Sequence, residues 1–176
     1  MEYPKHHRDI IHDLLDGKFL LAGEDSFISL KQNEGFYIEF FKESFNYDLK
    51  VTHDYSYIVS GETNETLSRD VSIFLALLCY EIDKDGKNFM DLIQFSEFEM
   101  ETIDHYFTNS SYPEVVNSNK QLKDKDSRKN FINMMNRRNI IEKNGDDRFV
   151  FTPAYKVFMD FARELGSSRI NQVQEA

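Results

Sequence analysis

Three histidines near the start of the chain are the residues whose types come closest to a metal site. His6, His7 and His12 lie within seven positions of one another. On a helix, the five-residue step from His7 to His12 turns their side chains ~140° apart. Zinc-binding helices instead place two histidines four residues apart. No second histidine cluster or cysteine pair accompanies them, so we predict no metal site here.

An acidic segment, "EIDKDGKNFMDL" (residues 81–92), has the beginning of a calcium loop. With Gly86 in the turn position, ligand positions one, three and five are acidic. Position twelve is Leu92, so the bidentate carboxylate that completes such a loop is missing. We interpret the segment as a solvated acidic loop.

The sequence also lacks the patterns that catalysis requires. The Gly-Lys pairs at 17–18 and 86–87 lack the upstream glycine and the following Ser or Thr of a phosphate loop. Neither His53 nor His105 has a serine or cysteine nucleophile at a recognisable spacing. We therefore predict a protein that is not an enzyme and needs no cofactor.

Basic residues gather in one part of an otherwise acidic chain. The 176 residues carry a formal net charge of −10. Residues 1–117 hold nine Lys/Arg against 23 Asp/Glu, whereas residues 118–145 hold eight against three. The first part repels DNA and the second attracts it. The candidate DNA contacts are Arg128, Lys129, Arg137, Arg138, Lys143 and Arg148. The alternative is a solvated face or a protein contact.

Aromatic residues gather elsewhere, in the first third of the chain, which holds part of the 16 Phe and nine Tyr. Aromatic side chains are enriched at protein interfaces. The candidate partner-binding residues are Phe36, Tyr37, Phe40, Phe41, Tyr55 and Tyr57. A packed core is the alternative explanation for the same residues.

The elements that position these residues follow from hydrophobic periodicity. In the first third we expect a helix that ends at Gly17, a short helix capped by Ser26, and an aromatic helix through Phe36 and Phe45. Two strands around His53–Asp54 complete the series. The expected order is helix, helix, helix, hairpin.

The second part is expected to repeat that order. An apolar helix covers residues 67–82, a second helix residues 90–107, and a polar connection residues 110–121. A helix over residues 127–138 then leads into a hairpin around Asn144–Gly145. Thr152 and Pro153 begin a last helix that Gly166 ends, and the tail beyond is expected to be loose.

This order predicts a mainly α fold with short β-hairpins (α+β), organised as tandem winged-helix domains. The predicted divisions are a first domain at residues 1–64, a second at 65–152, and a C-terminal helix and tail at 153–176. An ordinary helical domain with two incidental hairpins is the alternative. The single Cys79 fits a reducing compartment, and we detect no signal peptide or membrane span. We expect a cytoplasmic protein.

The layout resembles the KITE proteins, the small tandem winged-helix subunits of bacterial condensin-like SMC complexes, in particular the MukE/MksE group. The similar segments are "DIIHDLLDGKFLL", "GFYIEFFKESFNYDLKVTHDYSYIVS", "LSRDVSIFLALLCYEI" and "RKNFINMMNRRNIIEKNGDDRFVFTPAYKVFMDFA". These segments together span nearly the whole chain, and what they share with the family is the spacing and the type of their residues. The chain is shorter at its C-terminus than the MukE branch, which favours the MksE-like branch.

The resemblance implies a non-catalytic homodimer that binds the kleisin subunit and, through it, the SMC ATPase. It also implies a role in organising or entrapping DNA, in chromosome condensation and segregation or in plasmid defence. Such a protein is nucleoid-associated and binds DNA weakly and without sequence preference. The alternative function is a stand-alone winged-helix transcription regulator.

Overall fold

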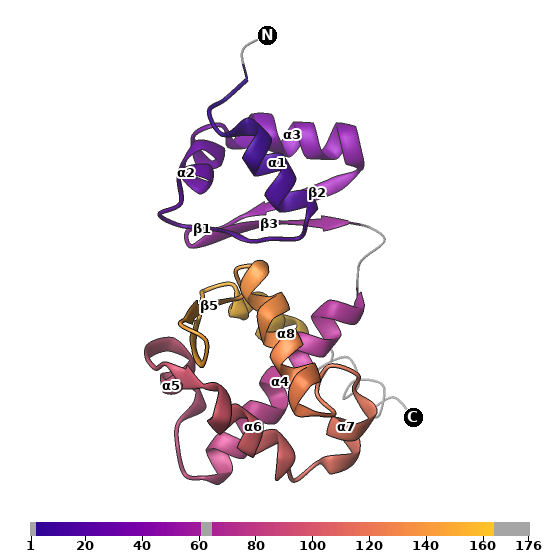
Figure 1. Cartoon of the computed structure of the whole chain (residues 1–176). Helices are drawn as coiled ribbons and strands as arrows, with labels where there is room; N and C mark the ends of the chain where they lie inside the picture. Colours follow the sequence, from indigo (N-terminus) through magenta and orange to yellow (C-terminus); the bar gives the residue numbers. More distant parts are fainter. Residues whose placement is uncertain (1–2, 61–64, 164–176) are drawn as a thin grey trace.

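The computed structural model describes residues 3–60 and 65–163. Within these residues helices dominate, and the strands form two antiparallel sheets of three strands each (Figure 1). The predicted fold class, mainly α with short β-hairpins, is confirmed. The predicted helix end at Gly166 and the tail after it lie outside the described residues, as does the predicted boundary after residue 64.

The first unit, residues 3–60, runs helix, strand, helix, helix, hairpin. Its elements are α1 (His7–Leu15), β1 (Leu20–Leu21), α2 (Asp25–Gln32), α3 (Glu34–Phe45), β2 (Tyr47–Val51) and β3 (Tyr55–Ser60). The strands lie in the order β1-β3-β2, with every pair antiparallel. Figure 1 shows the three helices on one face of this sheet, while the sheet faces the rest of the chain.

The second unit begins with the long helix α4 (Glu65–Lys84) and then repeats the pattern of the first, with one additional short helix before the one that precedes the hairpin. Its other elements are α5 (Phe89–Phe95), β4 (Phe98–Glu99), α6 (Met100–Thr108), α7 (Pro113–Ser118), α8 (Lys125–Arg137), β5 (Ile141–Asn144) and β6 (Arg148–Phe151). The strand order β4-β6-β5 matches that of the first sheet. Residues 155–163 form a last helix.

Local sequence signals explain the hairpin that follows α8. Asn144 pairs with Arg148 across the turn, and Gly145 adopts a φ of 75°. Glycine enters this left-handed region without steric cost, which fits the predicted Asn-Gly turn. Phe149 and Phe151 alternate with exposed neighbours and point into the core.

Several details of the two units differ from the prediction. The sequence predicted no strand at β1, and the last helix begins at residue 155 rather than at Pro153. The single helix expected over residues 90–107 is wrong, because Ser96 leaves the helical conformation and Phe98 pairs with Phe149 of β6. The polar connection expected over residues 110–121 contains α7. The acidic loop expected over residues 81–92 is partly helical, since α4 runs on to Lys84. Helix α2 begins at Asp25, ahead of the expected cap.

Two apolar clusters hold the fold together, and one of them joins the units. The smaller cluster lies within the first unit and is centred on Tyr37 and Phe41. The larger fills the second unit and also includes Phe19 and Tyr55 of the first. The ring of Phe19 lies 5.9 Å from that of Phe158 in the last helix. The first sheet therefore packs its helix-free face against the second unit.

Polar contacts reinforce this junction. Asn139, in the left-handed conformation with φ 59°, donates from Nδ2 to the carbonyl of Phe19 at 2.8 Å and to Glu24 Oε1 at 3.0 Å. The Phe19 amide in turn donates to the Arg138 carbonyl at 3.0 Å. These bonds connect residues 138–139, just after α8, to Phe19, just before β1, and to Glu24 of the first unit.

Candidate functional site

Helix α8 carries the first candidate surface. The Asp124 side chain caps its start by accepting the Ser127 amide at 2.8 Å. This bond lowers the pKa of the Asp124 carboxyl. The buried stripe of the helix consists of Phe131, Ile132 and Met135. The opposite side is consequently open to solvent.

The solvent side of α8 and the hairpin beside it together form what we call the basic face, defined by Lys129, Arg137 and Lys143. Lys129 and Arg137 are exposed on α8, and so is Asn130, which follows Lys129 in the sequence. Lys143 lies on β5 and reaches back to α8, where its Nζ donates to Asn133 Oδ1 at 3.2 Å. None of the three cations forms an ion pair among the described residues. Their charges remain available to an anion.

The remaining predicted DNA contacts have neighbours within the fold. Arg138 is half-buried, and its guanidinium lies against Gly17 of the first unit. Arg148 pairs with Glu97 at 3.3 Å and with Glu99 at 2.8 Å. The charge of Arg148 is thus largely compensated by two carboxylates, whereas Arg138 is partly covered by the first unit.

Arg128 lies in the core, although the sequence placed it with the surface cations. It is 5% exposed, and its guanidinium donates to Asp104, Thr108 and the Leu122 carbonyl at 2.6, 3.2 and 2.7 Å. The side chain thereby ties α8 to α6. We leave it out of the basic face, because every edge of the guanidinium is already bonded inside the protein.

The aromatic set divides between core and surface. Tyr37, Phe41 and Tyr55 are buried, and burial raises the pKa of Tyr37 to about 12. Tyr57 is half-buried and packs against Phe19 at the junction of the units. Only Phe36 and Phe40 of the predicted set reach solvent on α3. The aromatic residues that the sequence groups together are therefore of two kinds, buried core residues and residues that reach solvent.

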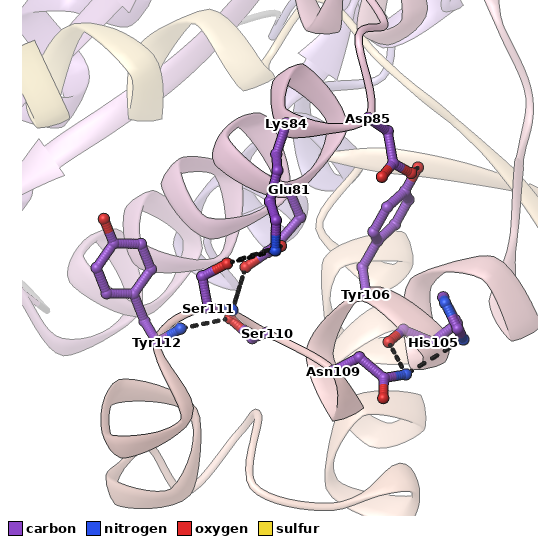
Figure 2. A network of polar contacts seen from close by, with 9 residues as sticks. All are labelled: Glu81, Lys84, Asp85, His105, Tyr106, Asn109, Ser110, Ser111 and Tyr112. Atoms are coloured by element: carbon purple, nitrogen blue, oxygen red, sulfur yellow. Dashed lines mark hydrogen bonds and ion pairs between the residues drawn. The ribbon is translucent and has the colours of Figure 1, made fainter.

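A buried carboxylate organises the second unit where the sequence resembled a calcium loop. Glu81 is 5% exposed and accepts hydrogen bonds from the Ser110 hydroxyl and the Ser111 amide (Figure 2). Lys84 Nζ lies 3.8 Å from the same carboxylate and donates to the Ser111 hydroxyl. The network fastens the loop between α6 and α7 onto α4. It has a structural role, and the oxygens of Glu81 already have partners.

Other reactive groups are held in unreactive forms. Burial, with the nearby Asp83 carboxylate, raises the pKa of the Cys79 thiol to about 11. Burial also raises the pKa of Tyr106, whose hydroxyl donates to Asp85 at 2.9 Å. Among residues 3–60 and 65–163 no group of His, Cys, Asp and Glu has the arrangement of a metal site. None of the described helices is long and apolar enough to span a bilayer.

The fold defines a class: a mainly α protein of two helix-and-hairpin units. The second unit carries a cluster of exposed or half-buried cations on α8 and β5. Residues 5–163 match the family described as condensin complex protein MksE. The match covers most of the chain, so the protein belongs to this family and is a subunit of a condensin-like complex. The comparison with curated proteins gave no match.

Proposed function

We propose that this chain is the tandem winged-helix subunit of an SMC complex, one that dimerises, binds the kleisin and holds DNA weakly against the complex. The order of elements in each unit supports a winged helix. An isolated strand pairs with the last strand of a two-stranded hairpin, the wing, which follows directly after a helix. Family membership supports partners within an SMC complex. The subunit itself catalyses nothing and acts by binding.

The observation that carries the DNA part of this proposal is the basic face. In winged-helix proteins the third helix and the wing are the parts that meet DNA. Here α8 and its hairpin present Lys129, Arg137 and Lys143 without ion-pair partners among the described residues. Lysine and arginine bind phosphates by releasing condensed counterions, irrespective of base sequence.

The charge of the whole chain limits this attraction. The formal net charge of −10 opposes the approach of DNA to the isolated subunit. We therefore expect weak binding by the subunit alone and stable retention only in the assembled complex, where a kleisin and an SMC ATPase bring DNA close. The complex is cytoplasmic and nucleoid-associated in this proposal.

Charge reversal on the basic face tests the DNA contact. In the reconstituted complex, Lys129→Glu/Arg137→Glu should weaken DNA retention and flatten the dependence of log K on log salt by roughly two units, about one per lost phosphate contact. The matched control is Arg8→Glu/Lys50→Glu, which changes the net charge equally at two exposed positions of the first unit. If the two variants retain DNA equally across the salt range, the basic face does not bind DNA.

Two further measurements test the remaining parts. Light scattering of the purified chain should give twice 20.8 kDa, and the chain should co-purify with the kleisin and SMC ATPase of its own genome. If the chain is a monomer and binds neither the kleisin nor the SMC ATPase, the proposed role as a subunit of the complex is wrong. A tight preference of the isolated chain for one operator would instead identify a transcription regulator.

A further inference from the structure

An exposed band of aromatic rings crosses α1 and α3 on the first unit. We call it the aromatic face, defined by Tyr3, His7, Phe36, Phe40, Phe45 and Tyr47. Tyr3 stacks on His7 with ring centroids 4.4 Å apart, and Phe36 lies 6.1 Å from Phe40 in a stacked arrangement. His7 is fixed by its Nδ1, which lies 3.3 Å from the Tyr37 hydroxyl. Figure 1 shows α3 on the side of the first unit away from the second.

The rings keep substantial exposure. Tyr3 is 56% exposed and Phe36 is 36% exposed, and Phe45 at the end of α3 is 39% exposed and 6.0 Å from Tyr47. Single exposed apolar side chains are ordinary, but a contiguous band marks an interaction surface. The band is continuous because each ring contacts the next, from Tyr3 to Tyr47.

Carboxylates border the rings along α3. Glu39 is three residues after Phe36, and Glu43 is three residues after Phe40, so each acid is a surface neighbour of a ring. Both acids are exposed, and neither forms an ion pair among the described residues. Lys42 of the same helix is paired with Asp48. The aromatic face is thus a π surface with a negative rim.

The position of α3 in the fold sharpens this observation. In the order of elements, α3 of the first unit corresponds to α8 of the second, since each precedes a hairpin whose last strand is central in its sheet. The residues of α3 include three acids against one lysine, whereas those of α8 include four cations against one acid. The helices at equivalent positions in the two units therefore differ in the sign of their charge, α3 being acidic and α8 basic.

We infer that the aromatic face binds a cationic segment of a protein partner, with arginine or lysine side chains over Phe36 and Phe40 and their charges beside Glu39 and Glu43. Cations are attracted to ring faces, and the attraction increases beside carboxylates. Nucleic acid is excluded by the negative rim. A second copy is disfavoured as well, because a symmetric contact brings the glutamates of both copies together. This inference deepens the protein-binding part of the proposed function and rests on it.

A labelled peptide titration tests the inference on the full chain. The probe is a short synthetic peptide that alternates arginine with leucine, and its counterpart alternates glutamate with leucine. Glu39→Lys/Glu43→Lys should weaken binding of the arginine peptide by about 10-fold or more in fluorescence anisotropy. Phe36→Ser should weaken it about 3-fold, through the lost ring. The glutamate peptide should not bind.

The matched control is Glu101→Lys/Glu114→Lys, which makes the same charge change at exposed positions of the second unit. It should bind the arginine peptide nearly as well as the unmodified chain. NMR shift changes should concentrate on the rings of Phe36 and Phe40. Circular dichroism should show the same thermal unfolding for all variants, since every substituted side chain is exposed.

Three results would overturn the inference. The first is equal weakening by the Glu39/Glu43 variant and by its control, which indicates diffuse attraction to an acidic protein. The second is no binding of the arginine peptide. The third is a dimer that Phe36→Ser dissociates, which assigns the face to a second copy. The proposed function fails through different results, namely no co-purification with kleisin and SMC ATPase, or DNA retention that is indifferent to Lys129 and Arg137.

Discussion

Replacing Arg128 by methionine should destabilise the protein strongly, although Arg128 lies next to Lys129 in the sequence. Removing one partner of a buried ion pair costs about 3–5 kcal/mol, because the other charge is left without compensation. Asp104 keeps 21% side-chain exposure and has Lys125 Nζ at 3.9 Å, so water and Lys125 offset part of that cost. We therefore expect a loss of about 3 kcal/mol in the free energy of unfolding.

Urea denaturation followed by circular dichroism measures this loss. For a chain of this length, about 3 kcal/mol corresponds to a decrease of roughly 6–12 °C in Tm. The matched control is Lys129→Met, which removes an exposed cation on the same helix and should change stability by less than about 0.5 kcal/mol. The double variant Arg128→Met/Asp104→Leu should recover about 1–2 kcal/mol of the loss, because the unpaired carboxylate is gone.

The reasoning would be refuted if Arg128→Met and Lys129→Met unfold at the same urea concentration. It would also be refuted if adding Asp104→Leu to the Arg128→Met variant lowers the free energy of unfolding further instead of recovering part of the loss. In either case Arg128 is not the tie between α6 and α8 that its three hydrogen bonds indicate.

Three further predictions concern the thiol, the junction and acid stability. At pH 8 the Cys79 thiol, with a pKa of about 11 against an ordinary 9.0, has a thiolate fraction about 100-fold below that of an unperturbed thiol. The greater nucleophilicity of the more basic thiolate offsets part of this, so Cys79 should react with a disulfide reagent about 10-fold more slowly. Reaction as fast as that of free glutathione would contradict this. Asn139→Gly should lower the free energy of unfolding by about 1–2 kcal/mol, because two hydrogen bonds are lost. Asn139→Ala should lower it by about 1 kcal/mol more, because alanine disfavours a positive φ. Equal urea midpoints for Asn139→Gly and the unmodified chain would show that the bonds contribute nothing. The hydrogen bonds from His53 and Lys156 lower the pKa of Asp54 in the folded protein, so the stability they contribute is present above the ordinary aspartate pKa and is lost as the pH falls through the lowered one. Asp54→Asn should therefore cost less than about 1 kcal/mol in the free energy of unfolding at pH 7, and this cost should shrink as the pH falls below the ordinary aspartate pKa. A cost that is the same at pH 7 and at pH 3 would refute the assignment.

The parts of the fold that sequence reasoning found are those decided by nearby residues. The hairpin after α8 follows from Asn144–Gly145, and the long apolar helix α4 from its own composition. Strand β4 was missed because its partner is β6, about 50 residues later, and nothing near Phe98 announces it. Strand β1 has the same dependence on β3.

The DNA-binding and partner-binding residues remain predictions. The structure divides them into buried and exposed residues, and residue type alone does not indicate that division. Arg128 lies three, four and seven residues before Phe131, Ile132 and Met135, which is the spacing of one buried stripe. That spacing was present in the sequence and places Arg128 inside. The burial of Tyr55 against the second unit, by contrast, depends on the docking of two units and has no local signal.

The bonds between Asn139 and Phe19 have a consequence for synthesis of the chain. The two residues are 120 positions apart, a distance that a ribosome covers in roughly 6–24 s. Throughout that interval the first unit can form its own core, but the ring of Phe19 and the underside of its sheet have no partner. We expect chaperones that recognise exposed aromatic surface to hold the nascent chain during this window. A first unit produced alone would leave that surface uncovered permanently, so we expect it to aggregate more readily than the whole chain.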